Sequence, residues 1–352
     1  MEFYKRKCLK DFLERTKVSL EVFVEFIRKK ESKLRAYYAE NIALSSHDFV
    51  KMILVDASFI FEVLFVGFFG KRPVNDRVYN KPWLLMDVMN DLFVLENQLP
   101  FFILEDLLSL ANIEIDHERV SMIKITHKFS CEYWDICKIE NLDEEHYSKV
   151  GHFVDFVRIR ALPSNLNVRK DSKYTTIPSV TELHQAGVRF KLSSSTNLFD
   201  IRFNNGILEI PKIKIGAPTE CLLRNLLAFE QCNCPANFIN DYVVLMNFLL
   251  KSSKDVDLLV KNGIIVNWHR DSEGISILFR NLVELASFHM SGSYYFSSIA
   301  ADLNSYCEAS WHKWMATLRQ DYFKTPWSII SFIAAVILLL LTFTQTMFSI
   351  PK

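Results

Sequence analysis

The last apolar segment of the chain constrains its structure more than any other feature. Residues 329–348 read IISFIAAVILLLLTFTQTMF and contain no charged side chain. A helix rises about 1.5 Å per residue, so this segment would extend about 30 Å, the hydrocarbon thickness of a bilayer. Trp327 precedes it, where an indole prefers the headgroup level. The sequence therefore predicts a transmembrane helix over residues 329–350. Its apolar residues include Ile329, Leu338, Leu341 and Phe348.

The rest of the chain is predicted to be a large helical domain over residues 1–320. Half of all residues are hydrophobic, which is enough for a sizeable core. The chain has 29 Phe but only 9 Gly, and few glycines argue against loop-rich all-β folds and phosphate-binding loops. Lys plus Arg equals Asp plus Glu at 41 each, so the chain has no overall basic field for nucleic acid.

Three features place this domain in the cytosol. Lys313, Arg319 and Lys324 precede the span and only Lys352 follows it, and positive charge favours the cytosolic side. The chain has no Asn-x-Ser/Thr glycosylation sequence. Its 7 cysteines are scattered and odd in number, which is typical of reduced thiols.

The N-terminal residues have helical periodicity. Residues 5–38 are predicted to form one helix, or two broken near 16–19. Ser45 and Asp48 form a capping box that begins a further helix. Asp56 lies inside the apolar stripe of that helix. It is either a functional acid with a raised pKa, or a carboxylate paired with an Arg or with backbone amides in the core.

A second polar motif lies at a predicted helix break. Residues 83–110 are apolar nearly all round and are predicted to form a central buried helix pair, broken at Pro100. Glu96, Asn97 and Gln98 lie at this break. They form either a polar site in an apolar pocket or a set of side chains that satisfies the freed backbone groups.

The periodicity changes in the second half of the chain. Residues 163–182 are predicted to be an exposed connection, and 181–186 a short helix that Gly187 ends. Alternating apolar residues around Asn204-Asn205-Gly206 predict one small sheet over residues 188–215. Helices are expected again at the following segments: 219–250, 254–262 and 275–320. A short joint at 321–328 would connect the domain to the membrane helix.

Several runs of the sequence resemble the plant domain-of-unknown-function 247 family. They are MILVDASFIFEVL at 52–64, NDLFVLENQLPFFIL at 90–104, TELHQAGVRFK at 181–191, LEIPKIKIGAPTECLLRNLLAFEQ at 208–231 and DYFKTPWSIISFIAAVILLLLTFTQTMFSI at 321–350. The resemblance implies a plant protein with a mainly helical domain, one carboxy-terminal membrane helix and no established enzymatic activity. Some grass members of the family are implicated in pollen–stigma self-incompatibility, a role bound to their lineage.

The chain departs from the family at its beginning. Family members usually carry a further N-terminal segment with a Pro-rich entry and a Ser-Ile-Gly-Pro-Tyr-His-like motif. Here Met1 leads directly into the Lys/Arg-rich first helix. We expect either a short variant or a truncated gene model. If the segment normally packs on the core, its loss would expose an apolar face.

Catalytic and metal-binding motifs are absent from the sequence. It contains no Walker-type phosphate loop, no G-x-G-x-x-G, no G-x-S-x-G and no His-Glu-x-x-His. We therefore expect no metal or cofactor and no enzymatic activity. Basic residues with interleaved aromatics occur at 1–7 and 28–35, where they could contact anionic lipid or form solvated helix faces.

The sequence thus favours a membrane-anchored binding or signalling protein, with a helical cytosolic domain that recognises another, unidentified protein. One alternative is an enzyme at the membrane surface that uses Asp56, Glu96 or Glu230 as buried acids. Another is a recognition protein whose domain faces outward, by analogy with pollen–stigma signalling.

Overall fold

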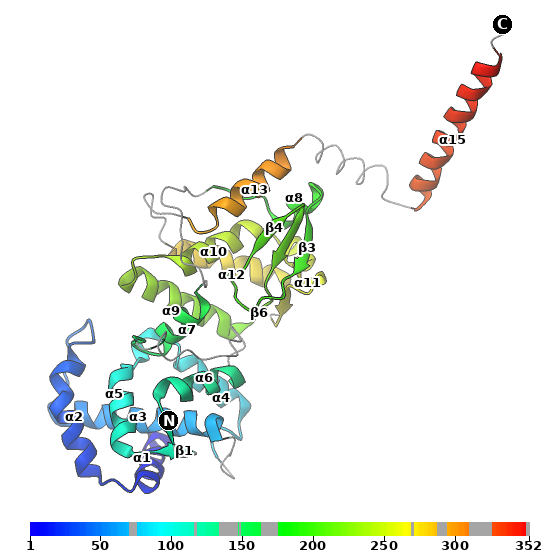
Figure 1. The fold of residues 1–352 in the computed structure, drawn as a ribbon. Coiled ribbons are helices and arrows are strands. Elements are labelled where there is room, and N and C mark those ends of the chain that lie inside the picture. Colours follow the sequence, from blue (N-terminus) through cyan, green and yellow to red (C-terminus); the bar gives the residue numbers. More distant parts are fainter. Residues whose placement is uncertain are drawn as a thin grey trace.

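The computed structural model describes residues 1–69, 76–115, 118–133, 147, 149–162, 175–268, 271–286, 294–309 and 326–349. The chain is mainly helical with a few short strands, which confirms the predicted fold class at that level. In Figure 1 helices α1 to α6 gather at one end, and α8 and α10 to α13 lie around β3, β4 and β6 at the other. Helices α7 and α9 lie between these two parts.

The first part is built on one long buried helix, α3. The helices of this part are α1 (Glu2–Thr16), α2 (Leu20–Arg35), α3 (Ser46–Phe69), α4 (Pro82–Asp91), α5 (Phe101–Ala111) and α6 (Met122–Tyr133). α3 packs against α1, α2 and α6. Phe12 stacks on Phe61 with ring centroids 5.1 Å apart and contacts Phe23 at 5.4 Å, and all three rings are fully buried. This aromatic cluster joins the first three helices.

Two predicted helix boundaries in this part are confirmed. The chain leaves α1 at Lys17, whose φ of 56° is left-handed, so the segment 5–38 is two helices rather than one. Ser45 accepts a hydrogen bond from the N–H of Asp48 at 3.1 Å and so caps α3. Both boundaries depend on residues close together in the sequence, and the structure has both.

Among the described residues one helix has the length and hydropathy of a membrane span, and it is α3. However, 67% of its most apolar window is buried inside the protein. α3 is therefore the core helix of the first part.

The predicted break at Pro100 divides the buried helix pair into three pieces. α4 ends at Asp91, a 3₁₀ turn η1 covers Leu95–Asn97, and α5 begins directly after Pro100. α5 is followed by two short antiparallel strands, β1 (Glu114–Ile115) and β2 (Glu118–Arg119). This pairing separates α5 from α6.

The larger sheet contains three strands. β4 (Arg202–Asn204) and β5 (Ile207–Ile210) form the antiparallel hairpin that Asn205-Gly206 predicted. β3 (Arg189–Leu192) runs parallel to β5 on its other side. Gly187, with a φ of 96°, lies between the short helix α8 (Val180–Gln185) and β3, as predicted.

The prediction of a single sheet up to residue 215 was wrong. β6 (Ile213–Ile215) pairs in parallel with β7 (Ile265–Asn267) and does not join the larger sheet. Pro211 lies between β5 and β6 and has no N–H for a strand ladder, so the chain can leave the first sheet there. The partner strand is too short and too distant in sequence to be recognised by periodicity.

The remaining helices pack mainly on one another, and some of them also contact these strands. They are α7 (Phe153–Ala161), α9 (Ala217–Asn233), α10 (Phe238–Leu249), α11 (Ser253–Lys261), α12 (Ser272–Leu285) and α13 (Ser297–Glu308). The stretch 275–320, expected as one long amphipathic segment, contains most of α12 and all of α13, and its last residues lie outside the described part. Most of the predicted connection at 163–182 also lies outside it.

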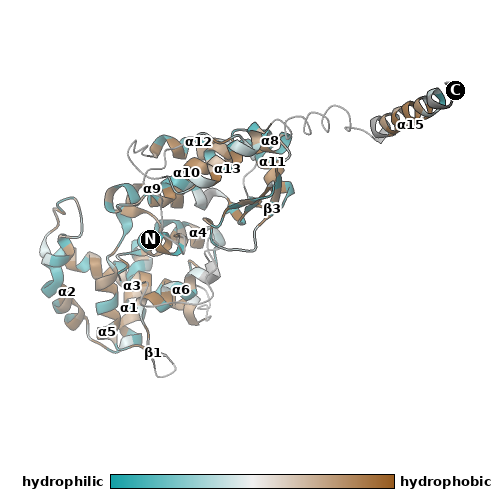
Figure 2. Cartoon of the chain, turned by 45° about the horizontal axis from the view of Figure 1, so that its top comes forward, coloured by the Kyte–Doolittle hydropathy of each residue, from teal (hydrophilic) through white to brown (hydrophobic). Residues whose placement is uncertain are grey.

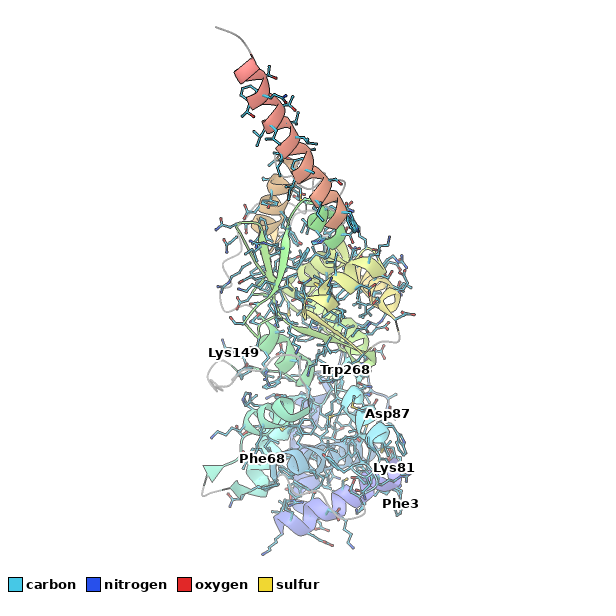
Figure 3. The ribbon with its side chains drawn as sticks, turned by 90° about the vertical axis from the view of Figure 1, so that its right-hand side faces the viewer. Phe3, Phe68, Lys81, Asp87, Lys149 and Trp268 are labelled. Carbon is cyan, nitrogen blue, oxygen red and sulfur yellow. The ribbon has the colours of Figure 1, made fainter. Side chains whose placement is uncertain are left out.

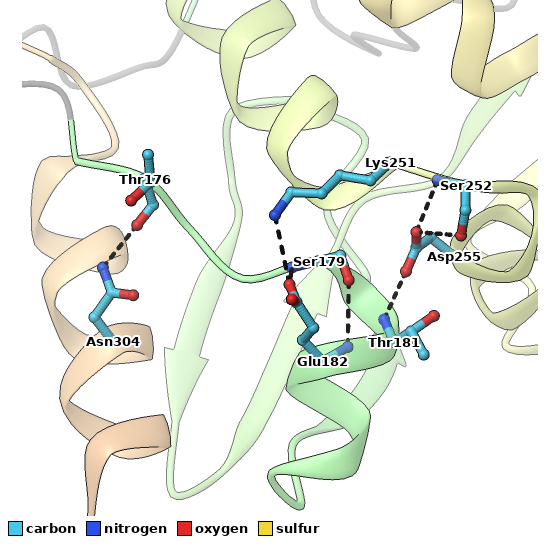
Figure 4. Close-up of polar contacts among 8 residues, drawn as sticks. All are labelled: Thr176, Ser179, Thr181, Glu182, Lys251, Ser252, Asp255 and Asn304. Atoms are coloured by element: carbon cyan, nitrogen blue, oxygen red, sulfur yellow. Dashed lines mark hydrogen bonds and ion pairs between the residues drawn. The ribbon is translucent and has the colours of Figure 1, made fainter.

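Two helix starts in this part are fastened to each other. Asp255 of α11 accepts hydrogen bonds from the N–H groups of Ser252 at 2.9 Å and Thr181 at 2.7 Å, so one buried carboxylate caps α11 and holds α8 (Figure 4). Glu182 and Ser179 form a capping box on α8. Asn304 of α13 donates to the carbonyl of Thr176 at 2.9 Å, which attaches α13 to the chain entering α8.

The C-terminal segment forms helix α15 (Pro326–Ser349), which stands apart from the rest of the chain in Figure 1. Every described side chain from Ile330 to Thr346 is exposed, and Figure 2 shows the helix as largely hydrophobic. The described apolar stretch, Ile330–Thr346, is a shorter apolar helix than α3. The predicted helix is thus present, and its insertion in a membrane stays a prediction. The predicted joint at 321–328 lies largely outside the described residues.

Candidate functional site

The most unusual polar side chain of the described residues is Glu230, near the end of α9. Only 1% of the residue is exposed. Its Oε2 accepts a hydrogen bond from the backbone N–H of Asn240 at 3.0 Å, in the first turn of α10. Burial raises the pKa of this carboxyl to about 7 against the lowering effect of the α10 backbone amides and of Arg158. Glu230 thus caps a neighbouring helix from a site that disfavours its charge.

Arg158 of α7 provides the opposite charge. Its Nε lies 3.8 Å from Oε1 of Glu230, which is longer than a hydrogen bond. Both atoms are buried, and neither has a hydrogen-bond partner among the described residues. Nη1 of Arg158 lies 3.7 Å from Oδ1 of Asp155, one turn earlier on α7. The guanidinium is therefore shared between two carboxylates.

The beginning of α7 packs against the same stretch of α9. His152 is the N-cap of α7, and its Nδ1 accepts the N–H of Asp155 at 3.2 Å. Its ring contacts Phe229 edge-to-face with centroids 4.7 Å apart. Burial lowers the pKa of His152, and burial likewise raises the pKa of Cys234 at the end of α9. The cluster of His152, Asp155, Arg158, Glu230 and Cys234 joins α7 to α9.

The chemistry available to this cluster is proton binding rather than nucleophilic attack. A raised thiol pKa keeps Cys234 protonated, and Nδ1 of His152 is occupied by its capping bond. No group of three His, Cys, Asp or Glu side chains in the described part of the chain could hold a metal ion.

Asp56 is not the buried carboxylate that the apolar stripe of α3 predicted. Its side chain is 30% exposed, and its Oδ1 lies 2.7 Å from Nζ of Lys5 on α1. The apolar stripe of α3 is a core face, as predicted. Asp56 lies at the edge of that face, where α1 crosses α3. Its partner is a lysine 51 positions away in sequence. Asp56 and Glu230 lie in the two different parts of the fold.

The three polar residues at the Pro100 break do not act alike. Glu96 and Asn97 are exposed on η1, so neither is a buried acid or a pocket residue. Gln98 is buried, and its Nε2 donates to the carbonyls of Leu92 at 2.9 Å and Val94 at 2.8 Å. Its Oε1 accepts the N–H of Val154 in α7 at 3.4 Å. Gln98 therefore serves the backbone groups at the break and connects them to the second part.

Three of the five basic residues at 28–35 form ion pairs within the domain. Lys29 lies 2.8 Å from Glu25, Lys30 lies 3.1 Å from Asp106, and Arg35 lies 2.8 Å from Glu31. Ion pairs within the domain leave less charge for anionic lipid, which favours solvated helix faces at 28–35.

Large exposed apolar side chains are dispersed over the domain. Phe3 is 80% exposed on α1, Trp83 64% on α4, and Trp268 68% directly after β7. Lys214 lies 5.4 Å from the ring centre of Trp268. In Figure 3 Trp268 lies at the level where the two parts meet and Phe3 at the far edge of the first part. These rings are therefore separate features of the surface.

Sequence reasoning identified Glu230 but missed its surroundings. Arg158 and Glu230 are 72 positions apart, and no periodicity relates them. Asp155 and Arg158 could have been noted as an i,i+3 pair on a short helix.

The predicted residues of the membrane span lie in α15, where Trp327 is 75%, Leu338 64% and Leu341 59% exposed. Ile329 and Phe348 belong to the same helix, and their side chains lie outside the described part.

Comparison with known proteins identifies one plant family and two relatives of the chain. A family model for DUF247, described as a plant protein of unknown function, matches residues 1–341. The chain is 27% identical to the UPF0481 protein At3g47200 of Arabidopsis thaliana, across 97% of this chain and 77% of that protein. It is 24% identical to the putative UPF0481 protein At3g02645 of the same plant, across 92% of this chain and 78% of that protein. No solved structure matches the chain.

Proposed function

The chain belongs to the DUF247 family of plant proteins of unknown function, and on that basis we propose that it is a membrane-anchored protein-binding protein. In this proposal α15 crosses the bilayer once. The helical domain, held at the cytosolic surface, recognises another protein.

The observation that carries this proposal is the surface of α15. Its described side chains from Ile330 to Thr346 are exposed, and most of them are apolar, which is unfavourable in water. The hydroxyls of Thr342, Thr344 and Thr346 donate to carbonyls of their own helix, at 2.8 to 3.0 Å. A helix whose hydroxyls are satisfied internally loses little when it enters hydrocarbon.

The enclosure of the titratable residues within the core supports a binding role for the domain. Buried aromatic and aliphatic side chains extend continuously through both parts. The titratable residues near Glu230 hold helices together and do not present a reactive group to solvent. This arrangement favours a binding or signalling module over a membrane-surface enzyme.

Membrane insertion is tested by alkaline extraction of microsomes that contain the full chain. We expect the protein to stay in the pellet, and Leu338→Arg to move it to the supernatant, because an arginine at the centre of a span costs about 2.5–3.5 kcal/mol. Leu338→Ile is the matched control and should pellet. Release of the unmutated protein would refute the anchor.

Orientation is tested on the same sealed microsomes with tags at both ends. Digestion of the large domain by added protease would support the cytosolic placement. Protection of the domain would refute that placement and favour an outward-facing recognition protein.

A further inference from the structure

Glu230 connects three helices through one carboxyl group. It lies on α9, it accepts a hydrogen bond from Asn240 in the first turn of α10, and it faces Arg158 of α7. Asn237, the residue before α10, makes no side-chain cap of its own. This carboxyl therefore lies where α7 and the start of α10 meet α9.

The surroundings compensate the charge of Glu230 incompletely. The backbone N–H groups of Asn240 and Ile239 favour the charged form, but Oε1 has no hydrogen-bond partner among the described residues and lies 3.8 Å from Nε of Arg158. Asp155 shares that guanidinium, and Asp241 of α10 adds a second negative charge near Glu230. Ionising a buried carboxyl group costs free energy when one of its oxygens accepts no hydrogen bond and the nearest cation is distant and shared with another carboxylate.

The remaining neighbours do not remove this cost. Cys234 on α9 is a neutral thiol, and His152 contacts the adjacent Phe229 while its Nδ1 is engaged in the α7 cap. α4, α12 and β6 also pack on α9: the charged side chains of α4 and α12 are exposed, and Lys214 of β6 lies over the ring of Trp268. Arg158 is thus the one cation that faces Glu230 in the described structure.

We propose that Glu230 is a proton-controlled latch, which holds α7 and the first turn of α10 on α9 when its carboxyl is neutral and loosens them when the carboxylate is ionised. The neutral carboxyl is compatible with burial. The ionised carboxylate gains more from water than from the partial pairing with Arg158, so it favours local opening.

The difference in proton binding between the closed and opened states determines how pH affects the opening. The pKa of Glu230 is raised from 4.5 to about 7 in the closed structure, whereas in an opened structure the carboxyl would titrate near its ordinary value. The closed state therefore binds more protons between these two values, and a rise in pH across this range favours opening. Above about pH 7 the effect levels off.

Local opening at the first turn of α10 should also affect the residues directly before α13. Asp241 follows Asn240 in α10, and its Oδ2 accepts the N–H of Tyr295 at 2.7 Å, directly before α13. Loosening of the first turn of α10 would therefore weaken the attachment of the segment that leads into α13. This inference rests on the described domain alone and does not depend on the membrane proposal.

The test is amide hydrogen exchange of the full chain in detergent micelles, measured at the start of α10 from pH 5.5 to pH 8. The reporter is the N–H of Asn240, expressed as a protection factor so that the intrinsic pH dependence of exchange is removed. In the unmutated protein we expect protection to fall about 30-fold over this range, and most of the fall to occur below pH 7.

Three variants make the result specific. Glu230→Gln should give the same protection at every pH, because the amide does not titrate. Arg158→Gln should move the fall to higher pH, because it removes the cation that favours the ionised form. Glu220→Gln is the matched control, since Glu220 is half-exposed on the same helix and pairs with Arg224 at 2.7 Å; it should behave as the unmutated protein does. Constant protection in the unmutated protein, or an unchanged fall in Glu230→Gln, would overturn the latch.

Discussion

The ring of Tyr306 on α13 lies directly over Gly206 at the turn of the β4–β5 hairpin. A Cβ on Gly206 would lie 2.6 Å from the hydroxyl oxygen of Tyr306 and 3.1 Å from the carbon that carries it. The same ring contacts Phe203 edge-to-face at 5.4 Å. Gly206 also has a φ of 73°, which L-residues with a side chain rarely adopt. The attachment of α13 to the hairpin thus depends on the absence of a side chain at this position.

We expect Gly206→Ala to lower the free energy of unfolding by about 2–4 kcal/mol, measured by denaturant unfolding in detergent. About 1–2 kcal/mol comes from the left-handed backbone, and the rest from displacement of Tyr306. Gly263→Ala is the control, because Gly263 has a similar φ of 71° and nothing within 4 Å of the added Cβ. Equal losses in both variants would show that Tyr306 yields without cost.

Gln98 should be much more important for stability than its neighbour Asn97. Gln98→Ala removes the donor to the carbonyls of Leu92 and Val94 and the acceptor of the buried N–H of Val154, whereas the carbonyl of Val94 keeps the N–H of Asn97 at 3.0 Å. We expect a loss of about 2–4 kcal/mol in the free energy of unfolding. Asn97→Ala, at an exposed position of η1, should change it by less than about 0.5 kcal/mol. Similar values for the two variants would contradict the role assigned to Gln98.

The elements that sequence could predict are those whose cause is local. The Asn205-Gly206 turn, the Ser45–Asp48 cap and the break at Lys17 each depend on residues within a few positions of one another. The Pro100 break also followed from a single residue. Composition and apolar periodicity were enough to predict a mainly helical chain.

What could not be predicted depends on contacts between distant positions. β6 pairs with β7 about 50 residues later, and Lys5 lies opposite Asp56. The environment of Glu230 was not predictable, because Arg158 reaches it only after α7 has packed on α9. The stripe that contains Asp56 marked a core face, but periodicity could not show that this residue lies at the edge of that face.

Asp255 should be a determinant of how α8 and α11 are held together. Its carboxylate accepts from the N–H groups of Thr181 and Ser252 and from the hydroxyl of Ser252. We expect Asp255→Ala to lower the free energy of unfolding by about 2–4 kcal/mol, because buried donors lose a charged acceptor. Asp257→Ala is the control on the same helix, since Asp257 is exposed and accepts one hydroxyl bond from Ser272. It should cost less than about 1 kcal/mol.

His152 should make the domain sensitive to mild acid. Its Nδ1 accepts the N–H of Asp155 only while the imidazole is neutral, and burial lowers the pKa of His152 below its ordinary value of 6.5. The unfolded chain then binds the proton more readily, so this contribution to stability is full above about pH 6.5 and is lost as pH falls through the lowered pKa.

His152→Asn keeps a good capping acceptor that does not titrate. We therefore expect the difference in unfolding free energy between His152→Asn and the unmutated protein to grow in favour of the variant as pH falls from 7.5 to 5. His184→Asn, at an exposed position of α8, should leave the pH profile as it is. His152→Ala should lose about 1 kcal/mol at neutral pH, where the cap is fully formed in the unmutated protein. A His152→Asn profile parallel to that of the unmutated protein would mean that the imidazole binds protons equally in the folded and unfolded chains, which would contradict the lowered pKa of His152.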